Sequence, residues 1–362
     1  MKLLHYILVS GIALLWAVPM PAQTADERAE AHRMSVQGLN AMEKGEYRQA
    51  IEAFAKAEKL DLRNPQYPIQ LAQAYFFDRQ FEKTKELVKP MMNRRRGRPE
   101  AWQLYGNSLD EQGKIYEALQ TYRDGLKRFP NSGLLYLEMG ILEYGRDNDA
   151  IALQYWEEGI RRNPTFPSNY YFAAKVHHRR GDYVWAAAYA EMYLNLDRIG
   201  ERTREMSVLL LQAYDDARWF DFQEAFKWKF YQVPESLHVA VAGDTTPVPA
   251  YAQQYDEAYA SELTDTNYVL TLELLVSLRR FVAFYIPARY PEHPINGLLE
   301  WHRLIAGRNH FRAYTYWLLY DARPEEFLAW YEEGRDEYEA FEGWFLHNTY
   351  HKHFKESVVR EK

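Results

Sequence analysis

Histidines gather toward the end of this 362-residue chain. His347 and His351 stand four residues apart, so on a helix they share a face and could hold a metal ion as paired ligands. No Glu lies between them in the position of a metalloprotease base, and a third ligand would have to come from His302 or His310. The alternative is a pair of solvated histidines near the terminus. We favour that alternative and predict neither a metal nor another cofactor.

A second group of titratable side chains suits general acid–base chemistry. His293, Glu300, His302 and His310 follow one another closely, and they would form a catalytic site only if the fold brought them into one pocket. The chain has no Gly-x-Ser-x-Gly motif and no glycine-rich phosphate loop, so no residue is predicted as catalytic outright. Convergence of these four side chains would favour an enzyme, and dispersal would not.

The overall composition excludes several other functions. The formal charge is −7, which disfavours nucleic-acid binding, and the absence of cysteine rules out disulfides and thiolate metal sites. The basic stretch "NRRRGRPE", residues 93–100, could hold a phosphate or an anionic lipid head group. We interpret it as a solvated loop whose arginines are balanced by the excess of acidic residues in the chain.

The elements that carry these residues are predicted to be helices. In "GKIYEALQTYRDGLKRFP", residues 113–130, the apolar Ala118, Leu119, Tyr122 and Leu126 recur at spacings of three and four, which places them on one helix face. Pro130 ends the helix because proline lacks an amide hydrogen and its ring clashes with the preceding turn.

The same helix recurs every 34 residues. Its small and aromatic anchors, Ala118 and Tyr122, return as Ala50 with Phe54 and as Ala152 with Trp156. Five units therefore begin near residues 31, 65, 99, 133 and 167, and each also carries an earlier helical segment such as "AWQLYGNSL". The second and fifth units depart from the pattern, and we expect thinner contacts at these places: Thr84, Val88 and Ala190.

This pattern resembles the tetratricopeptide repeat, with its W-x2-L-G-x2-Y segment followed by A-x3-F and a later proline. The resemblance covers residues 31 to about 200 and implies an all-α fold, a solenoid of helical hairpins over 31–215 that includes a capping helix. Small residues at Gly38, Gly106 and Gly140 would let paired helices approach closely.

The resemblance also implies that a protein or peptide partner binds along the first helix of each unit. The groove positions carried over are mostly apolar or aromatic, with two polar exceptions: Ile69, Phe76, Phe77, Asn107, Leu137, Ile141, Tyr144, Tyr171 and Lys175. Ser35, Leu39 and Gln103 stand where a carboxylate-binding groove would have Lys, Asn or Arg. We expect the occupant to be a hydrophobic helix or extended segment, either of a partner or of the chain's own C-terminal part.

After the repeats the pattern changes. Residues 216–250 contain prolines and a glycine without helical periodicity, which predicts a linker. Residues 251–362 predict an all-helical, aromatic-rich C-terminal domain without a recognisable motif.

The first 23 residues have a basic start, an apolar run from Leu3 to Val18 and small or turn-forming residues near Ala22, the three parts of a secretory signal. A single membrane anchor is the alternative, and no later segment is apolar enough to span a bilayer. We expect a periplasmic or secreted protein of the bacterial envelope that acts as an interaction scaffold. The rival hypothesis is an envelope enzyme whose repeats recruit substrate to a C-terminal metal or acid–base site.

Overall fold

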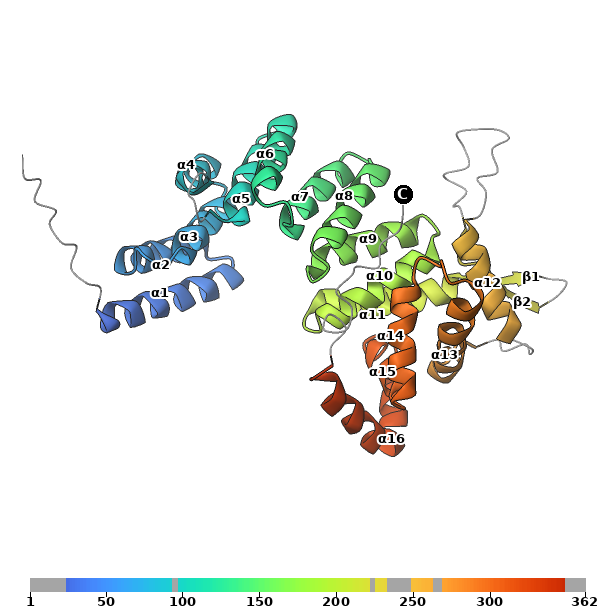
Figure 1. The fold of residues 1–362 in the computed structure, drawn as a ribbon. Coiled ribbons are helices and arrows are strands. Elements are labelled where there is room, and N and C mark those ends of the chain that lie inside the picture. Colours follow the sequence, from blue (N-terminus) through green and yellow to red (C-terminus); the bar gives the residue numbers. More distant parts are fainter. Residues whose placement is uncertain (1–23, 93–96, 222–224, 233–248, 263–268, 349–362) are drawn as a thin grey trace, which may run out of the picture. The chain divides into compact units, whose positions relative to one another are not determined.

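The computed structural model describes residues 24–92, 97–221, 225–232, 249–262 and 269–348 (Figure 1). The fold is all-α apart from one short hairpin. The chain divides into two compact units, Met1–Leu87 and Val88–Lys362, which we call unit one and unit two and describe separately. The predicted signal segment, residues 1–23, and the arginine stretch at 93–96 lie outside the described residues.

Ten helices form the five predicted hairpins, with two helices in each 34-residue repeat. Their bounds are α1 Ala25–Glu43, α2 Tyr47–Leu60, α3 Gln66–Phe77, α4 Phe81–Met92, α5 Pro99–Asp110, α6 Ile115–Arg128, α7 Gly133–Tyr144, α8 Asp149–Arg162, α9 Pro167–Arg179 and α10 Tyr183–Leu196. The segment 113–130 is therefore the second helix of the third hairpin.

Unit one is held together by the small residues of α1. Thr24 begins the helix with a capping box, because its side chain accepts from the Glu27 amide and the Glu27 carboxylate accepts from the Thr24 amide. Gly38 faces Phe54 of α2 so closely that a Cβ at this position would lie 2.5 Å from the ring. The helices can approach at this crossing because Gly38 has no side chain.

The same contact recurs in unit two. Gly106 of α5 faces the ring of Tyr122 on α6, and Gly140 of α7 faces the ring of Trp156 on α8. Both rings are fully buried, as is Ala118. The predicted role of small residues at the helix crossings is confirmed at these positions.

The helix α11, Glu201–Asp216, continues the periodicity beyond the fifth hairpin. Its Arg202 donates to Ser168 of α9 at 3.4 Å, and its Glu205 accepts from the hydroxyl of Tyr171; both pairs are separated by 34 residues. It therefore lies beside α9 as the first helix of a further repeat would.

The segment predicted to be an irregular linker contains a β-hairpin. Strands β1, Arg218–Asp221, and β2, Ala225–Trp228, pair antiparallel with Arg218 opposite Trp228. The aromatic residues Phe226, Trp228 and Phe230 alternate with lysines, which is the two-residue period of a strand. Residues 233–248 of this passage lie outside the described part.

Five helices complete unit two: α12 Ala250–Glu262, α13 Leu272–Arg289, α14 Asn296–Gly307, α15 Phe311–Leu318 and α16 Pro324–Phe345. They share one hydrophobic core with the fourth and fifth hairpins and α11, so the predicted boundary near residue 215 does not separate two compact bodies. Among the helices of the described ranges, none is both long enough and apolar enough to cross a membrane.

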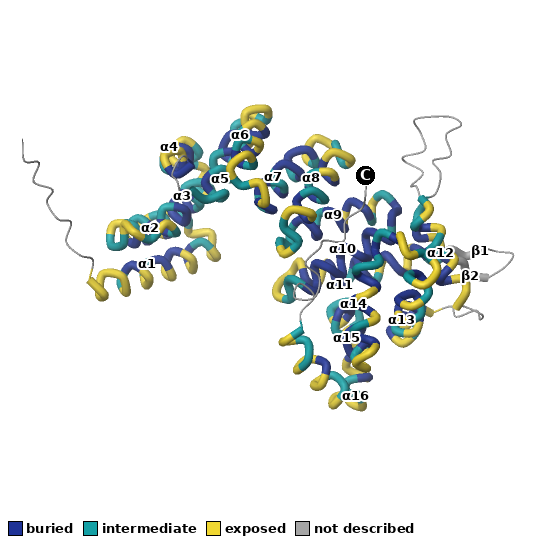
Figure 2. The backbone as a smooth tube through the Cα atoms, in the orientation of Figure 1, coloured by how far each residue is buried: buried dark blue, intermediate teal, exposed yellow. Residues whose placement is uncertain are grey.

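The second helix of the fifth repeat, α10, lies at the centre of this core (Figure 2). Ala190 is fully buried, as are its neighbours Tyr189 and Met192. The prediction of thinner contacts at Ala190 was wrong, because the C-terminal helices pack on the side of α10 that would otherwise face solvent. Asn195 of α10 donates to the Tyr314 hydroxyl at 2.8 Å, and Ser207 of α11 donates to the Leu318 carbonyl at 2.8 Å.

Candidate partner-binding face and buried polar clusters

In unit one, the predicted groove residues at the end of α3 form an aromatic surface. Phe77 is 52% exposed, and its ring lies 5.7 Å from that of Tyr47 and 5.6 Å from that of the half-buried Phe76. Leu39 of α1 is 44% exposed, whereas Ile69 is buried and contributes to packing. We refer to Tyr47, Phe76 and Phe77 as the unit-one aromatic face.

In unit two, the predicted groove residues of α7 are covered to a larger extent. Leu137 is buried and Ile141 is half-buried, so neither offers a large apolar surface. Tyr144 carries a cation on its ring, because the guanidinium of Arg179 lies 4.9 Å from the ring centre and donates to the hydroxyl at 2.9 Å. Arg179 also pairs with Asp149. An arginine thus covers an aromatic side chain that the sequence predicted to be open.

Tyr171 of α9 is enclosed in the same way. The Lys175 ammonium lies 4.9 Å and the Arg202 guanidinium 4.8 Å from the centre of the Tyr171 ring. The Tyr171 hydroxyl donates a hydrogen bond to Glu205. Burial, followed by the hydrogen bond to Glu205, raises the pKa of Tyr171, and that same hydrogen bond lowers the pKa of Glu205. Tyr144, Tyr171, Lys175, Arg179 and Arg202 make up what we call the unit-two cation–aromatic face.

Asn107 of α5 belongs to a polar cluster inside unit two. The side-chain amide of Asn107 lies 2.5 Å from the Tyr122 hydroxyl. When the amide nitrogen is oriented toward Glu138, it lies 3.3 Å from the Glu138 carboxylate. Gln103 donates to Glu138 at 2.6 Å. Burial raises the pKa of Glu138 although both amides oppose the shift by hydrogen bonding. Asn107 therefore has internal partners at the place predicted for partner binding.

In the described part of unit two, no hydrogen bond joins the C-terminal helices to Tyr144, Tyr171 or Lys175. Their hydrogen bonds to the repeats go instead to α10, α11 and the turn before α10, as in the bonds of Asn195, Ser207 and Asp182. Residues 349–362 lie outside the described part, so the hypothesis that the chain's own C-terminal part occupies the groove stays a prediction.

The main junction between the repeats and the C-terminal helices is a buried charged cluster. Glu191 of α10 accepts from Arg279 of α13 at 2.8 Å, from Tyr314 of α15 at 2.7 Å, and from His302 of α14 at 2.6 Å. Arg279 also donates to Thr315 at 2.9 Å. All of these side chains are at most 3% exposed. We call this set the Glu191 cluster.

The protonation states in the Glu191 cluster follow from burial and charge. Burial alone would raise the pKa of Glu191, but Arg279 and His302 outweigh it and lower the pKa to about 2. The pKa of His302 is lowered, mainly by burial. Glu191 acts in the opposite direction, and the charge of Arg279 lowers the pKa further. The cluster therefore holds an ion pair between Glu191 and Arg279 and, at neutral pH, a neutral His302 that donates its Nε2 proton.

A second buried cluster joins the same two parts of unit two. His177 of α9 lies 3.3 Å from Asp182 and 3.1 Å from Glu157, and Asp182 also accepts from Tyr251 of α12 at 2.7 Å. Burial lowers the pKa of His177, yet the two carboxylates outweigh burial and the net shift is upward. The two carboxylates thus favour the protonated form of His177, and the three side chains stabilise the turn onto which α12 packs.

The four side chains of the acid–base hypothesis do not converge. His302 lies in the Glu191 cluster, and His293 is buried with its Nε2 3.0 Å from the Tyr251 carbonyl. His310 stacks against Trp344, and Glu300 is exposed. No group of three potential metal ligands occurs among the residues that the structure describes. His351 lies outside those residues, so the predicted pair with His347 has no described geometry.

Sequence reasoning missed several residues of these surfaces and clusters. Glu191 interrupts the otherwise apolar stretch "AAAYAEMYL", and Arg279 lies with Arg280 in the mostly apolar stretch "LLVSLRRFVAF". A charge within such a stretch is the signal that could have marked them. Arg202 and Glu205 could have been found by stepping 34 residues beyond Ser168 and Tyr171.

The fold defines a class, the proteins built from tandem antiparallel helical hairpins in which a glycine of the first helix faces an aromatic ring of the second. Within that class, the model of the tetratricopeptide repeat family matches residues 99–142, which comprise the third hairpin and most of α7. Residues 99–142 thus match a tetratricopeptide repeat, and they lie within a series of five helical hairpins over residues 31 to about 200.

The chain is also similar, at low identity, to a curated protein and to solved structures. The photosystem I assembly protein Ycf3 of Cuscuta gronovii is 29% identical over 121 residues, which cover 32% of this chain and 71% of that protein. The pilF structure of Pseudomonas aeruginosa is 19% identical with a TM-score of 0.38, covering 53% of this chain and 87% of that one. A thermophilic repeat protein of Thermus thermophilus is 16% identical with a TM-score of 0.41, covering 51% and 98%.

The pKa of Glu191 predicts how the stability of unit two depends on pH. A folded-state pKa of about 2, below the ordinary value of 4.5, means that this stabilisation is complete above pH 4.5 and is lost as the pH falls toward 2. The shift corresponds to about 3 kcal/mol of unfolding free energy. We expect Glu191→Gln to remove this part of the acid dependence, as measured by denaturant unfolding at pH 5 and pH 2.5. Equal losses in parent and variant would contradict the assignment.

Proposed function

We propose that this protein is an interaction scaffold that binds a segment of a partner protein along the first helices of its repeats. Tetratricopeptide-repeat proteins generally serve as protein-interaction scaffolds, and the observation that carries the proposal here is the unit-one aromatic face. Phe77 keeps 52% of its surface exposed beside Tyr47 and Phe76. Exposed aromatic clusters of this kind are typical of binding surfaces, because burying such side chains supplies most of the energy of an interface.

The two faces would make different contributions. The unit-one aromatic face offers apolar rings to a hydrophobic helix or extended segment. The unit-two cation–aromatic face offers the outer edges of Lys175, Arg179 and Arg202, each of which lies over a tyrosine ring. Lys175 and Arg179 also pair with the carboxylates of Glu205 and Asp149. Fixed cations add selectivity and association rate more than affinity. We therefore assign the main binding energy to unit one.

We also propose that the protein works in the bacterial envelope or outside the cell. The composition of residues 1–23 supports this, since it combines a basic start, an apolar run and small residues near Ala22. Mass spectrometry of the protein recovered from its host should find a chain that begins near Gln23 or Thr24. An intact Met1 on a cytosolic species would contradict export.

The binding proposal is tested by replacing one exposed ring. A photo-reactive amino acid at Gln73 of α3 would first identify the partner by cross-linking in envelope extracts. With that partner purified, Phe77→Ala should weaken its binding to the full chain by more than tenfold, measured by calorimetry.

The matched control is Tyr116→Ala on the second helix α6, where an even more exposed ring, at 79%, is not one of the predicted binding positions. Its affinity should match that of the parent. If both variants bind as the parent does, the first-helix face of unit one is not the binding surface.

A further inference from the structure

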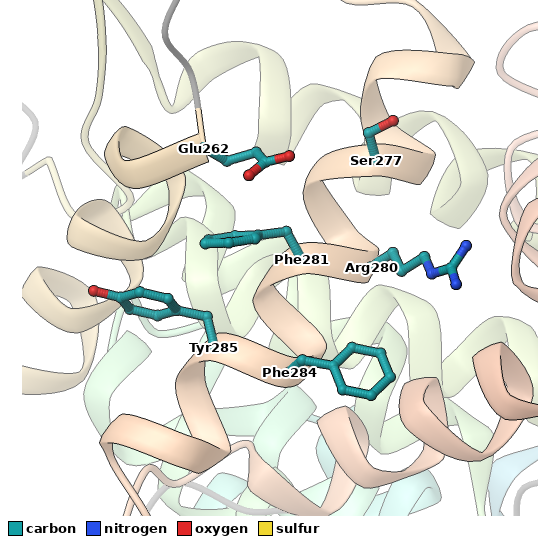
Figure 3. Close-up of a pocket in the computed structure, with 6 residues that line it drawn as sticks. All are labelled: Glu262, Ser277, Arg280, Phe281, Phe284 and Tyr285. Atoms are coloured by element: carbon teal, nitrogen blue, oxygen red, sulfur yellow. The ribbon is translucent and has the colours of Figure 1, made fainter.

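A second surface with the features of a binding site lies on α13, outside the predicted groove. The inward face of this helix packs into the core through Leu275, Leu278 and Val282. Its outward face borders a depression of about 600 Å³ between α12 and α13, lined by Ser277, Arg280, Phe281, Phe284, Tyr285 and Glu262 (Figure 3). This surface belongs to unit two alone.

The depression is aromatic on the side of α12. The rings of Phe281 and Tyr285 lie 5.2 Å apart and point toward α12 in Figure 3, and Tyr285 is fixed because its hydroxyl donates to Glu257 at 3.0 Å. Phe284, one helical turn from Arg280, is 47% exposed. A bound segment would therefore meet the rings of Phe281 and Tyr285 on the side of α12, the second of them held in place, and the ring of Phe284 on the other side of α13.

Two arginines lie beside these rings and have no acidic partner among the residues that the structure describes. Arg280 is exposed, and it borders a second depression of about 360 Å³ as well, which Arg312 and Glu337 also line. Arg303 of α14 places its guanidinium 5.6 Å from the ring centre of Phe284. Neither Arg280 nor Arg303 makes an ion pair or side-chain hydrogen bond with any residue of the described ranges, whereas Arg289 and Arg312 pair with Glu257 and Glu273.

We propose that this face of α13 binds a peptide segment of a partner protein in which an aromatic side chain is flanked by carboxylates. The ring would enter between Phe281 and Phe284, and the carboxylates would pair with Arg280 and Arg303. Charge complementarity selects the occupant, because the two guanidinium groups outnumber the one described carboxylate that lines the depression, that of Glu262, and so favour an acidic segment over a neutral or basic one. This site is independent of the groove proposed above.

Three labelled heptapeptides test the proposal on the full chain by fluorescence anisotropy: Gly-Ser-Glu-Phe-Glu-Ser-Gly, the same peptide with both Glu changed to Lys, and the same peptide with Phe changed to Ala. The acidic aromatic peptide should bind at least tenfold more tightly than either of the others. Arg280→Glu should weaken it at least tenfold and should improve binding of the lysine peptide, a reversal that a folding defect cannot produce. Phe284→Ala should also weaken it at least tenfold.

The control Arg28→Glu makes the same charge change at an exposed arginine of unit one and should leave all three affinities unchanged. Equal binding of the three peptides, or no binding of any, overturns the proposal. A gain of more than tenfold on deletion of residues 349–362 overturns it too, because the chain's own terminus would then be the occupant. Phe77→Ala should not change the affinity for these peptides. A failure of the proposed α13 site can therefore be distinguished from a failure of the proposed groove.

Discussion

Glu191→Ala should lower the unfolding free energy of unit two by about 3–5 kcal/mol, because it removes one partner of a buried ion pair and leaves the charge of Arg279 uncompensated. Glu191 and Arg279 are at most 2% exposed, so water cannot replace the lost carboxylate without opening the core. The Tyr314 hydroxyl and His302 Nε2 would lose the same acceptor.

Hydrogen exchange can locate this loss. The amides of α13, α14 and α15 should lose protection before those of α5 and α6, because the cluster fixes the C-terminal helices to α10. The matched control is Glu201→Ala at an exposed position of α11, whose effect should stay within about 0.5 kcal/mol.

A second substitution separates the charge from the packing. Adding Arg279→Met to Glu191→Gln should recover most of the lost stability, since a buried ion pair replaced by neutral groups of similar size is often tolerated. If Glu191→Ala left the denaturant midpoint unchanged, the cluster would not hold the two parts of unit two together.

The repeats could be predicted from sequence because their signals are local. Ala118 and Tyr122 lie one turn apart on one helix, and the glycine that faces Tyr122 precedes it by only 16 residues. Contacts of such short range recur with the 34-residue period, so five copies reinforce one another. The same argument explains why the small-residue crossings at Gly106 and Gly140 were predicted correctly.

The Glu191 cluster could not be predicted in this way. Glu191 lies 88 residues from Arg279, 111 from His302 and 123 from Tyr314, and no period relates these positions. Their proximity depends on how α13, α14 and α15 pack against α10. Local sequence patterns do not show this packing. The sequence therefore placed His302 in a hypothetical catalytic group, whereas the structure places it in a buried junction.

For the unit-two cation–aromatic face, the sequence predicted which helices carry the tyrosines but not which side chains cover their rings. The periodicity correctly put Tyr144 and Tyr171 on the first helices, and these rings were expected to present apolar surface. The structure adds Arg179 and Arg202 above them, one from the last turn of α9 and one from α11. Long cationic side chains reach across helices, so which ring they cover is decided by tertiary packing.

Trp156→Ala should also cost about 3–5 kcal/mol, because it deletes the largest fully buried side chain of the fourth hairpin and leaves a cavity. The indole stacks on Phe172 of α9 with ring centres 5.3 Å apart, lies 5.8 Å from Tyr144 of α7, and donates its Nε1 proton to the Leu137 carbonyl at 3.2 Å. One side chain thus supports two helices that carry the unit-two cation–aromatic face.

Gly140 provides the test that this ring sets the helix spacing. A Cβ at Gly140 would fall well inside van der Waals contact with the indole, so Gly140→Ala should cost about 1–3 kcal/mol in the parent. In the Trp156→Ala background the clash is absent, and alanine is the better helix former by about 1 kcal/mol. The same substitution should then be neutral or stabilising, as measured by a double-mutant cycle in denaturant. An equal cost in both backgrounds would show that Trp156 does not determine how closely α7 and α8 approach.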